Sequence, residues 1–208
     1  MLSYSFVKSF FPFSSFLFIF FFLVFVVKLP IYGLHFWLPM AHVEAPTFGS
    51  MILAGVLLKL GGVGLIRCFS FINWDFLSYY SLGYFVIFLV YVPLVCSFQS
   101  DFKRLVAYSS VSHMMVVPIM AMFFSSLSLK GVILVLLFHG LSSPLIFALV
   151  GYTYSLFGTR QLVFIRGLVV LSPLLSFLFI LAFFFTLCVP PFPSFVSEVL
   201  FFMSRISA

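Results

Sequence analysis

The chain has 208 residues, of which 64% are hydrophobic and 7% are charged, and its mean hydropathy is +1.33. This composition excludes a water-soluble domain, which would have too little polar surface to cover its core. The net charge is +6, but the basic residues are scattered singly, without a basic patch interleaved with aromatic residues outside the apolar runs, which excludes a nucleic-acid-binding protein.

Long apolar segments predict an all-α, polytopic membrane helix bundle with about six spanning segments, because a helix needs roughly 20 apolar residues to cross the hydrocarbon core. The Phe, Leu and Val runs do not alternate as the strands of a membrane β-barrel would. We predict one transmembrane domain over residues 1–208, with spanning segments in chain order at about 9–38, 46–69, 81–98, 105–124, 131–157 and 168–203.

The first and last of these segments are both interrupted by proline. Lys8 precedes the first segment, as in a signal peptide, but the apolar run is long, Phe-rich and without an A-x-A cleavage site, which favours a spanning segment. Lys28 and Pro30 interrupt this run, whereas the last run is interrupted by prolines 190, 191 and 193 and continues through Glu198. Paired interrupted segments point to a transport site, so we predict that both are discontinuous helices.

Lys59 lies well inside the Gly-rich second segment. Gly55 is four residues before it and Gly62 three residues after it, so both share its helix face and allow close approach of another helix. The nearer end of the segment is about eight residues away, a rise of roughly 12 Å, which is too far for the amine to reach the headgroups comfortably. An ionisable group at this depth indicates a functional site.

Two histidines occur in neighbouring segments, each beside serines at helical spacing. Ser109 and Ser110 precede His113 by four and three residues, and Ser142 and Ser143 follow His139 by three and four. Each histidine alone is equally compatible with a hydrogen-bonded core residue. Together they predict a hydrated row of polar side chains, called the track below, since imidazole titrates near neutral pH and suits proton relay.

Other polar residues have simpler interpretations. Glu44 is expected to favour the helix N-terminus that opens the second segment. Asp101, Lys103 and Arg104 are interpreted as interfacial charges. No two cysteines have CxxC spacing, so we expect no metal or iron–sulfur site, and we interpret all three as small packing residues: Cys68, Cys96 and Cys188.

Five apolar segments therefore each carry one candidate proton-translocating residue: Lys28, Lys59, His113, His139 and Glu198. Burial disfavours the charged form of lysine and of glutamate, which brings both closer to proton exchange at neutral pH. The break beside Lys28 would leave mobile, hydratable backbone next to a site that holds a proton inside the membrane.

Four stretches carry a family resemblance, and they occur in order along residues 26–200. They are KLPIYGLHFWLPMAHVEAPTFGSMILAGVLLKLGGVGLIR from Lys28, DFKRLVAYSSVSHM from Asp101, FHGLSSPLIF from Phe138 and PPFPSFVSE from Pro190. The chain resembles subunit 4 of mitochondrial NADH:ubiquinone oxidoreductase (respiratory complex I), an antiporter-like membrane subunit, more closely than subunits 2 or 5.

The resemblance implies a membrane-arm subunit that conducts protons, coupled to electron transfer from NADH to quinone. Lys28 would be the lysine of the first discontinuous helix and Lys59 the central lysine between two half-channels. His113 and His139 would continue the polar axis, and Glu198 would be its terminal glutamate in the second discontinuous helix. No cofactor is expected in this chain, because other subunits of the complex would bind NADH, FMN, the iron–sulfur clusters and ubiquinone.

The resemblance also implies partners and a location. Subunits 2 and 5 would be the neighbours in the mitochondrial inner membrane, with a bacterial plasma membrane as the alternative. Met40 stands where bacterial relatives carry Asp, which weakens any role for this position. The family has earlier helices, one bearing a glutamate that partners the lysine at Lys28, and we expect a separate chain to carry them.

Two other functions stay open from the sequence. One is a subunit of a stand-alone cation/proton antiporter, which shares the motif. The other is a degenerate structural spacer of the membrane arm, which the retention of five ionisable residues in apolar segments disfavours, since each is costly in lipid.

Overall fold

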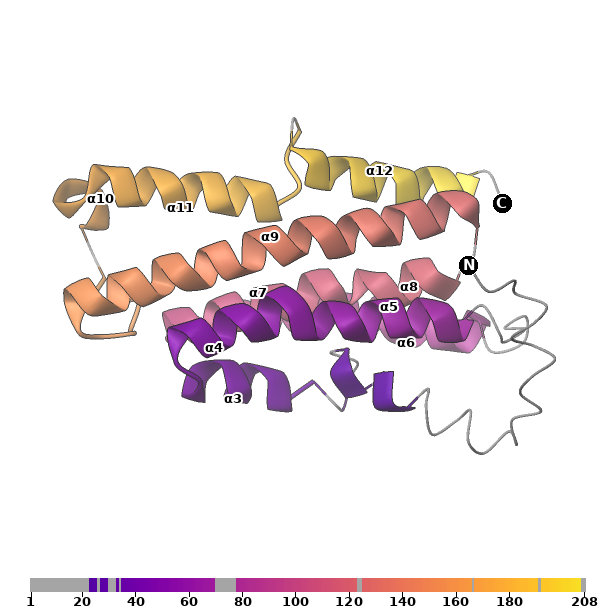
Figure 1. Ribbon diagram of the computed structural model, residues 1–208, viewed down its shortest axis with the longest axis horizontal. Helices are drawn as coiled ribbons and strands as arrows, with labels where there is room; N and C mark the ends of the chain where they lie inside the picture. Colours follow the sequence, from indigo (N-terminus) through magenta and orange to yellow (C-terminus); the bar gives the residue numbers. More distant parts are fainter. Residues whose placement is uncertain are drawn as a thin grey trace.

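The structure is a computed structural model that describes residues 23–25, 27–29, 33, 35–69, 78–122, 125–165, 167–190 and 192–206. Over these residues it is helical, without a named β-strand, and a single isolated bridge joins Asp101 to Gln161. The longer helices run side by side along the long axis of the molecule (Figure 1). The all-helical part of the fold prediction is therefore confirmed for the described residues. Residues 1–22, which include about half of the predicted first segment, lie outside them, as do the predicted break at Pro30 and the polar loop after Phe69.

The second predicted segment forms one continuous helix with an irregular turn. It consists of α4 (Thr47–Ile52), the π-helical turn η1 (Leu53–Leu57) and α5 (Leu58–Phe69). The short helix α3 (Trp37–Glu44) precedes it. Glu44 is exposed and ends α3, whereas Pro46 occupies the cap of α4, so the predicted role of Glu44 at the start of this helix is wrong.

The long helix α9 (Ser126–Phe157) lies at the centre of the bundle. It begins about five residues before the predicted start because Ser125 and Ser128 form a reciprocal capping box, each side chain accepting from the other's backbone N–H at 3.0 and 2.9 Å. It ends at Gly158, whose φ of 66° is readily adopted by glycine. Together with residues 47–68, it is long and apolar enough to cross a membrane.

The remaining helices pack against α9 or against its neighbours. They are α6 (Ser78–Ser97), α7 (Phe102–Met114), α8 (Val116–Met122), the short α10 (Leu168–Leu171), α11 (Pro173–Thr186) and α12 (Pro193–Ile206). Helices α4, α7, α8, α11 and α12 all contact α9. Residues 187–192 separate α11 from α12. In Figure 1 these two helices lie roughly end to end, and the chain between them is not helical.

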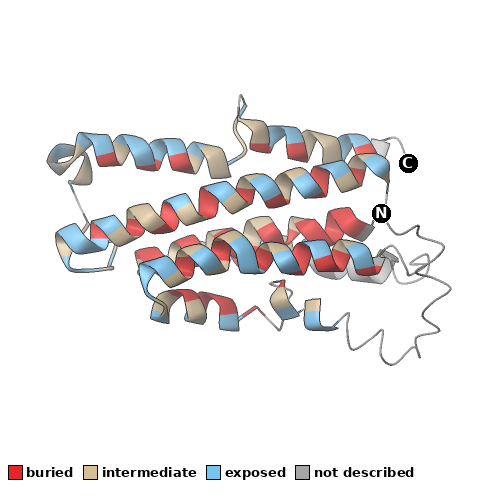
Figure 2. Ribbon diagram, in the orientation of Figure 1, coloured by how far each residue is buried: buried red, intermediate tan, exposed pale blue. Residues whose placement is uncertain are grey.

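Burial follows this arrangement. In Figure 2 the buried positions gather on the faces that α7, α8 and α9 turn toward their neighbours, and α8 is mostly buried. Large apolar side chains stay exposed along the outer helices, including Ile87 on α6 and Leu174 and Phe177 on α11. Such outward apolar faces fit a protein whose outer solvent is lipid.

Candidate functional site

Lys59 and His139 form a direct contact between α5 and α9. The Nζ atom of Lys59 lies 2.9 Å from Nδ1 of His139, and it also donates to the backbone carbonyl of Ala54. Ala54 belongs to η1, the π-helical turn just before α5. A π-turn re-aims the carbonyls of a helix and is often found at functional sites. Here it provides a polar partner for the amine within the same helix.

Glycines allow this contact to form. A Cβ atom on Gly140 would lie 3.3 Å from Cε of Lys59 and 3.7 Å from the carbonyl oxygen of Gly55. A Cβ atom on Gly55 would lie 3.1 Å from Cγ of Pro144. The two helices approach so closely that a side chain at either glycine would press on its neighbour. The prediction that Gly55 faces another helix beside Lys59 is therefore confirmed by this geometry.

His113 on α7 lies next to His139 on α9. Their ring centroids are 6.3 Å apart. Both rings line a cavity of about 40 Å³, and Glu198 lies on its wall. One water needs roughly 10–15 Å³, so this cavity is large enough for water. Its walls come from α7, α8, α9, α11, α12 and the break between the last two: His113, Val116, Val135, Phe138, His139, Ser142, Phe185, Thr186, Cys188, Ser194, Ser197 and Glu198.

The serines predicted to line the track have mixed roles. Ser142 lines the cavity. The hydroxyls of Ser109, Ser110 and Ser143 instead donate to backbone carbonyls of their own helices, at 2.8, 2.8 and 2.7 Å. This is the usual alternative for a serine at helical spacing in an apolar helix. The first turns of α12 supply the further serines Ser194 and Ser197.

Lys28 is placed beside α5 but apart from the cavity. Its Cβ atom would lie 3.0 Å from a Cβ added to Gly61, and its amine lies over the Phe25 ring, 6.0 Å from the centroid. Among the described residues, no carboxylate pairs with it. The structure thus brings together four of the five predicted residues, and Lys28 is not among those four.

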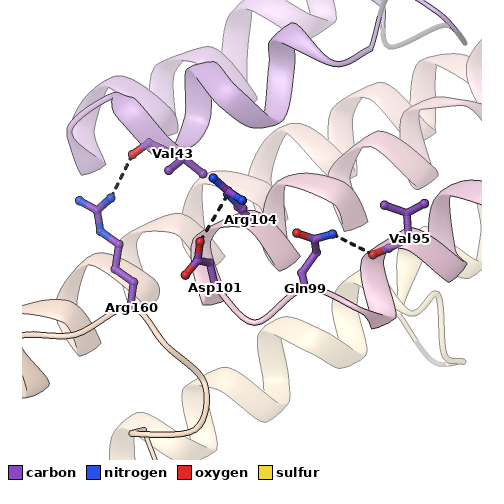
Figure 3. A network of polar contacts seen from close by, with 6 residues as sticks. All are labelled: Val43, Val95, Gln99, Asp101, Arg104 and Arg160. Carbon is purple, nitrogen blue, oxygen red and sulfur yellow. Dashed lines mark hydrogen bonds and ion pairs between the residues drawn. The ribbon is translucent and has the colours of Figure 1, made fainter.

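Lys103, one of the three charges predicted to be interfacial, and Arg160 in the loop after α9 form a clamp on α3. Lys103 is only 4% exposed and donates to the backbone carbonyl of Ala45, which follows α3. Arg160 donates to the carbonyl of Val43 at 3.1 Å (Figure 3). Asp101 and Arg104 form an ion pair at 3.4 Å, with about half of the arginine side chain exposed. Lys103 is thus buried within the protein, where its amine serves a helix end, and its place at the membrane interface stays a prediction.

The clamp joins two loops as well. The N–H of Phe102 donates to the carbonyl of Arg160 at 2.9 Å, and the N–H of Leu162 donates to that of Ser100 at 3.0 Å. The loop before α7 and the loop after α9 are therefore paired backbone to backbone. Their basic side chains reach the same end of α3, which fixes this short helix against the bundle.

His42 was missed as a site residue by sequence reasoning. It is fully buried on the inner face of α3, and its ring stacks on Phe147 with centroids 4.6 Å apart. Neither ring nitrogen has a hydrogen-bond partner in the described part of the chain. Lys59, Lys103 and His139 all lie close enough to interact with it electrostatically. Because α3 is apolar nearly all round, hydrophobic periodicity carries no signal for this placement.

The described residues contain no group of three or more His, Cys, Asp or Glu side chains placed to hold a metal ion. The side chains around the cavity instead combine exchangeable protons with a water-sized space. This arrangement is suited to proton transfer over short steps.

Comparison with known proteins identifies the family. Residues 4–208 match the family described as "NADH:quinone oxidoreductase/Mrp antiporter, TM". The chain belongs to this family. The match extends beyond residues 26–200, which carry the recognised motifs.

Curated relatives agree with the subunit-4 resemblance. The chain is 41% identical over 183 residues to NADH-ubiquinone oxidoreductase chain 4 of Strongylocentrotus purpuratus, covering 86% of this chain and 40% of that protein. It is 46% identical over 159 residues to the protein of the same name in Arbacia lixula, covering 74% of this chain and 35% of that protein. The chain therefore spans about two fifths or less of the length of these relatives.

Solved structures share the fold. A chain of the archaeal membrane-bound sulfane sulfur reductase complex superposes with a TM-score of 0.78 at 21% identity, over 87% of this chain and 38% of that one. A chain of the Mrp complex from Dietzia sp. DQ12-45-1b superposes with a TM-score of 0.80 at 20% identity, over 89% and 35%. At these identities, the likeness concerns the fold alone.

Proposed function

We propose that this chain is a membrane-arm subunit of NADH:ubiquinone oxidoreductase and conducts protons coupled to electron transfer from NADH to quinone. The contact between Lys59 and His139, at 2.9 Å, is the observation that carries this proposal. It joins two ionisable groups on different helices, and the histidine opens onto a cavity shared with His113 and Glu198. The names of the curated relatives support the choice of complex.

Proton movement along this axis would run by short steps. A proton leaving the Lys59 amine would pass to His139 and then, through the cavity, to His113 or Glu198. Because imidazole can donate at one nitrogen and accept at the other, each histidine can pass a proton onward without moving its ring far. His42 would extend the axis from Lys59 toward α3, since its buried ring nitrogens have no other described partner.

The proposal includes the arrangement of the membrane segments. Residues 1–208 would form one transmembrane domain of about six spanning segments, two of them discontinuous. Residues 187–192 would be one break, with the other between Lys28 and α3. The mitochondrial inner membrane would be the location, which the animal relatives named NADH-ubiquinone oxidoreductase chain 4 support, and subunits 2 and 5 would be the neighbours. No redox cofactor would bind to this chain, and NADH, FMN, iron–sulfur clusters and ubiquinone would be held by other subunits.

The surroundings of Lys28 lead to a prediction about the group that pairs with its amine. Because it lacks a described carboxylate neighbour, we infer that helices outside this sequence place a carboxylate within about 4–6 Å of its amine. A structure of the assembled complex tests this directly: only lipid or apolar side chains around Lys28 would argue that this end of the axis does not conduct protons.

The identity of the assembly is tested by purification in mild detergent of the native complex that contains this chain. We expect flavin and iron–sulfur subunits in the same particle, with NADH:quinone reductase activity. The second candidate function is a subunit of a stand-alone cation/proton antiporter, which the fold shared with an Mrp complex chain favours. Purification with other membrane subunits alone, without flavin or iron–sulfur subunits, would support that candidate instead.

A further inference from the structure

A groove of about 290 Å³ lies between α11 and the loop that joins α9 to α10. It has far more room than the water-sized cavity beside His139, which measures about 40 Å³. Its walls are apolar except at Ser176, and they consist of Phe102, Leu162, Ile165, Leu168, Ser176, Phe179, Ile180 and Phe183. The hydroxyl of Ser176 already donates to the carbonyl of Pro173 at 2.8 Å. The groove therefore suits an apolar occupant.

The groove opens on the outer surface of the bundle. Ile180 lines it and is 51% exposed. Leu174 and Phe177 of the same helix are exposed as well, and Figure 2 shows exposed positions along α11. In a membrane such a surface faces hydrocarbon. A lipid acyl chain therefore has access to this groove and matches its polarity.

The loop that forms the second wall combines apolar side chains with positive charge. Leu162 and Ile165 line the groove, whereas Val163 and Phe164 between them are exposed. The loop sequence, GTRQLVFIRG from Gly158, contains two arginines and no acidic residue. Exposed apolar side chains next to arginines are typical of segments at the level of the lipid headgroups.

Positive charge also predominates in the segments that meet this loop. Residues 43–45, 100–104 and 158–167 together contain four basic and two acidic residues, which gives a net charge of +2. Of the two acidic residues, Asp101 pairs with Arg104 at 3.4 Å. The charge at this end of the groove is therefore complementary to an anion.

Among the described residues of the loop, Arg160 carries the charge. It donates to the carbonyl of Val43 at 3.1 Å, and its guanidinium group lies over the Tyr154 ring, 4.9 Å from the centroid. A guanidinium group has five N–H donors and can bind phosphate oxygens in pairs. The backbone carbonyl of Arg160 accepts from Phe102, which lines the groove, at 2.9 Å. This bond holds the charged loop next to the apolar groove.

We propose that the groove is a binding site for an anionic phospholipid. One acyl chain lies between α11 and the loop, and the phosphate lies over the loop near Arg160. Basic residues beside an apolar groove between membrane helices are suited to such a lipid. The bound chain fills space that protein side chains leave open and holds the first turns of α11 against the start of α7. This site is separate from the proton path and does not depend on it.

The test uses the purified native complex in vesicles that contain a trace of phospholipid with a photoreactive diazirine on one acyl chain. Two probes are compared, phosphatidylglycerol and phosphatidylcholine with the same chains, so that only the headgroup charge differs. Labelled peptides are mapped by mass spectrometry after illumination. We expect the anionic probe to label residues 162–183 at least about five-fold more than the neutral probe, as for one arginine near the membrane surface.

Two pairs of variants test the groove and the charge. Ile180→Trp fills the groove and should lower labelling by the anionic probe to the level of the neutral probe. Ile133→Trp is the matched control, because Ile133 is 52% exposed on α9 and does not line the groove. Arg160→Gln should lower the preference for the anionic probe about five-fold. Arg160→Lys keeps the charge and should keep the preference, as should Lys130→Gln near the start of α9.

Three results would overturn the proposal. Equal labelling by both probes in the unmodified complex would mean that the groove faces bulk lipid without selecting a headgroup. No labelling by either probe would mean that another protein segment covers the groove. An unchanged preference in Arg160→Gln would remove the role of the arginine. If Ile180→Trp fails to assemble, the two probes in the unmodified and Arg160→Lys complexes still decide. Labelling is measured without electron transfer, so a failure of proton conduction would leave these results unchanged.

Discussion

Two lysines inside the helix bundle, half-buried Lys59 and buried Lys103, differ above all in their partners. Both amines donate to a backbone carbonyl at an irregular point of a helix, Ala54 in the π-turn for Lys59 and Ala45 after α3 for Lys103. Lys59 also contacts the imidazole of His139, a group that can accept and release protons. Lys103 instead lies near the guanidinium of Arg160, which stays protonated in proteins.

The partner of each amine distinguishes a lysine that takes part in proton transfer from a lysine that only stabilises the helix bundle. A carbonyl oxygen accepts a hydrogen bond but does not carry a proton away at neutral pH. Only a second ionisable group converts a buried amine into a step of a proton path. We therefore expect variants of Lys59 to affect proton movement and variants of Lys103 to affect stability, as the following experiments examine.

The largest effect is expected for Lys59→Ala. This change removes the amine that contacts His139, and proton pumping by the assembled complex in vesicles should fall at least about ten-fold, as for loss of a proton-transfer group. Lys103→Ala should lower pumping much less. The dye-quenching rate divided by the NADH oxidation rate measures both. Equal losses for the two variants would contradict the placement of the proton axis.

A second variant, at His42, tests whether the proposed proton path extends from Lys59 to α3. His42→Phe keeps an aromatic ring against Phe147 but removes both unpartnered nitrogens. We expect pumping to fall about three- to ten-fold, while thermal stability is kept within a few degrees because no buried hydrogen bond is lost. Thermal denaturation of the purified complex and pumping in vesicles provide the two measurements. Unchanged pumping would make His42 a buried ring without a transport role.

Replacing the residues that clamp α3 should lower the thermal stability of the complex. Lys103→Ala leaves the carbonyl of Ala45 without this buried donor, and Arg160→Ala does the same for Val43. Each loss should cost roughly 1–3 kcal/mol, seen as earlier thermal loss of the complex. Lys103→Arg should keep part of the stability, because a donor remains. Lys130→Ala is the matched control, since Lys130 is an exposed lysine in the first turns of α9. Equal stability of Lys103→Ala and Lys130→Ala would rule out the clamp.

The helical class and the cavity histidines could be predicted from local sequence signals. Apolar run length predicts helices without knowledge of contacts. Glycine spacing predicts that Lys59 faces another helix, and the Gly55–Pro144 approach agrees. The start of α9 was placed late because its first turn, with Ser126, Ser128 and Lys130, reads as a polar loop. Only the reciprocal bonds of the capping box make this turn helical.

The identities of the tertiary partners could not be read from one sequence. Lys103 was interpreted as an interfacial charge because DFKR is a polar cluster at the edge of an apolar run. Its burial depends on the end of α3, 58 residues earlier in the chain. The surroundings of His42 and Cys188 also depend on distant segments: His42 stacks on Phe147 of α9, and Cys188 lines a cavity with His113 of α7. Such pairings depend on packing between distant segments, which periodicity does not encode.

The smallest effect on proton pumping is expected for a change that alters only the packing around the Lys59 side chain. Gly140→Ala adds a methyl group 3.3 Å from Cε of Lys59, so the lysine side chain must shift by a few tenths of an ångström. Such a shift lengthens the contact with His139 without removing it, and we expect pumping to fall by about two-fold or less. The alanine should also favour helix by roughly 0.5–1 kcal/mol, which offsets the strain of the tight contact.

Gly131→Ala is the matched control for this last change. It gives α9 the same gain in helix preference, but the added Cβ would lie 3.4 Å from the carbonyl oxygen of Ser197, on the α12 side. Pumping lowered by Gly140→Ala and unchanged by Gly131→Ala would show that proton transfer depends on the exact position of the Lys59 amine. Equal values for both variants and the unmodified complex would mean that the lysine adjusts freely at this contact, so that its partner His139, rather than its packing against α9, governs the transfer.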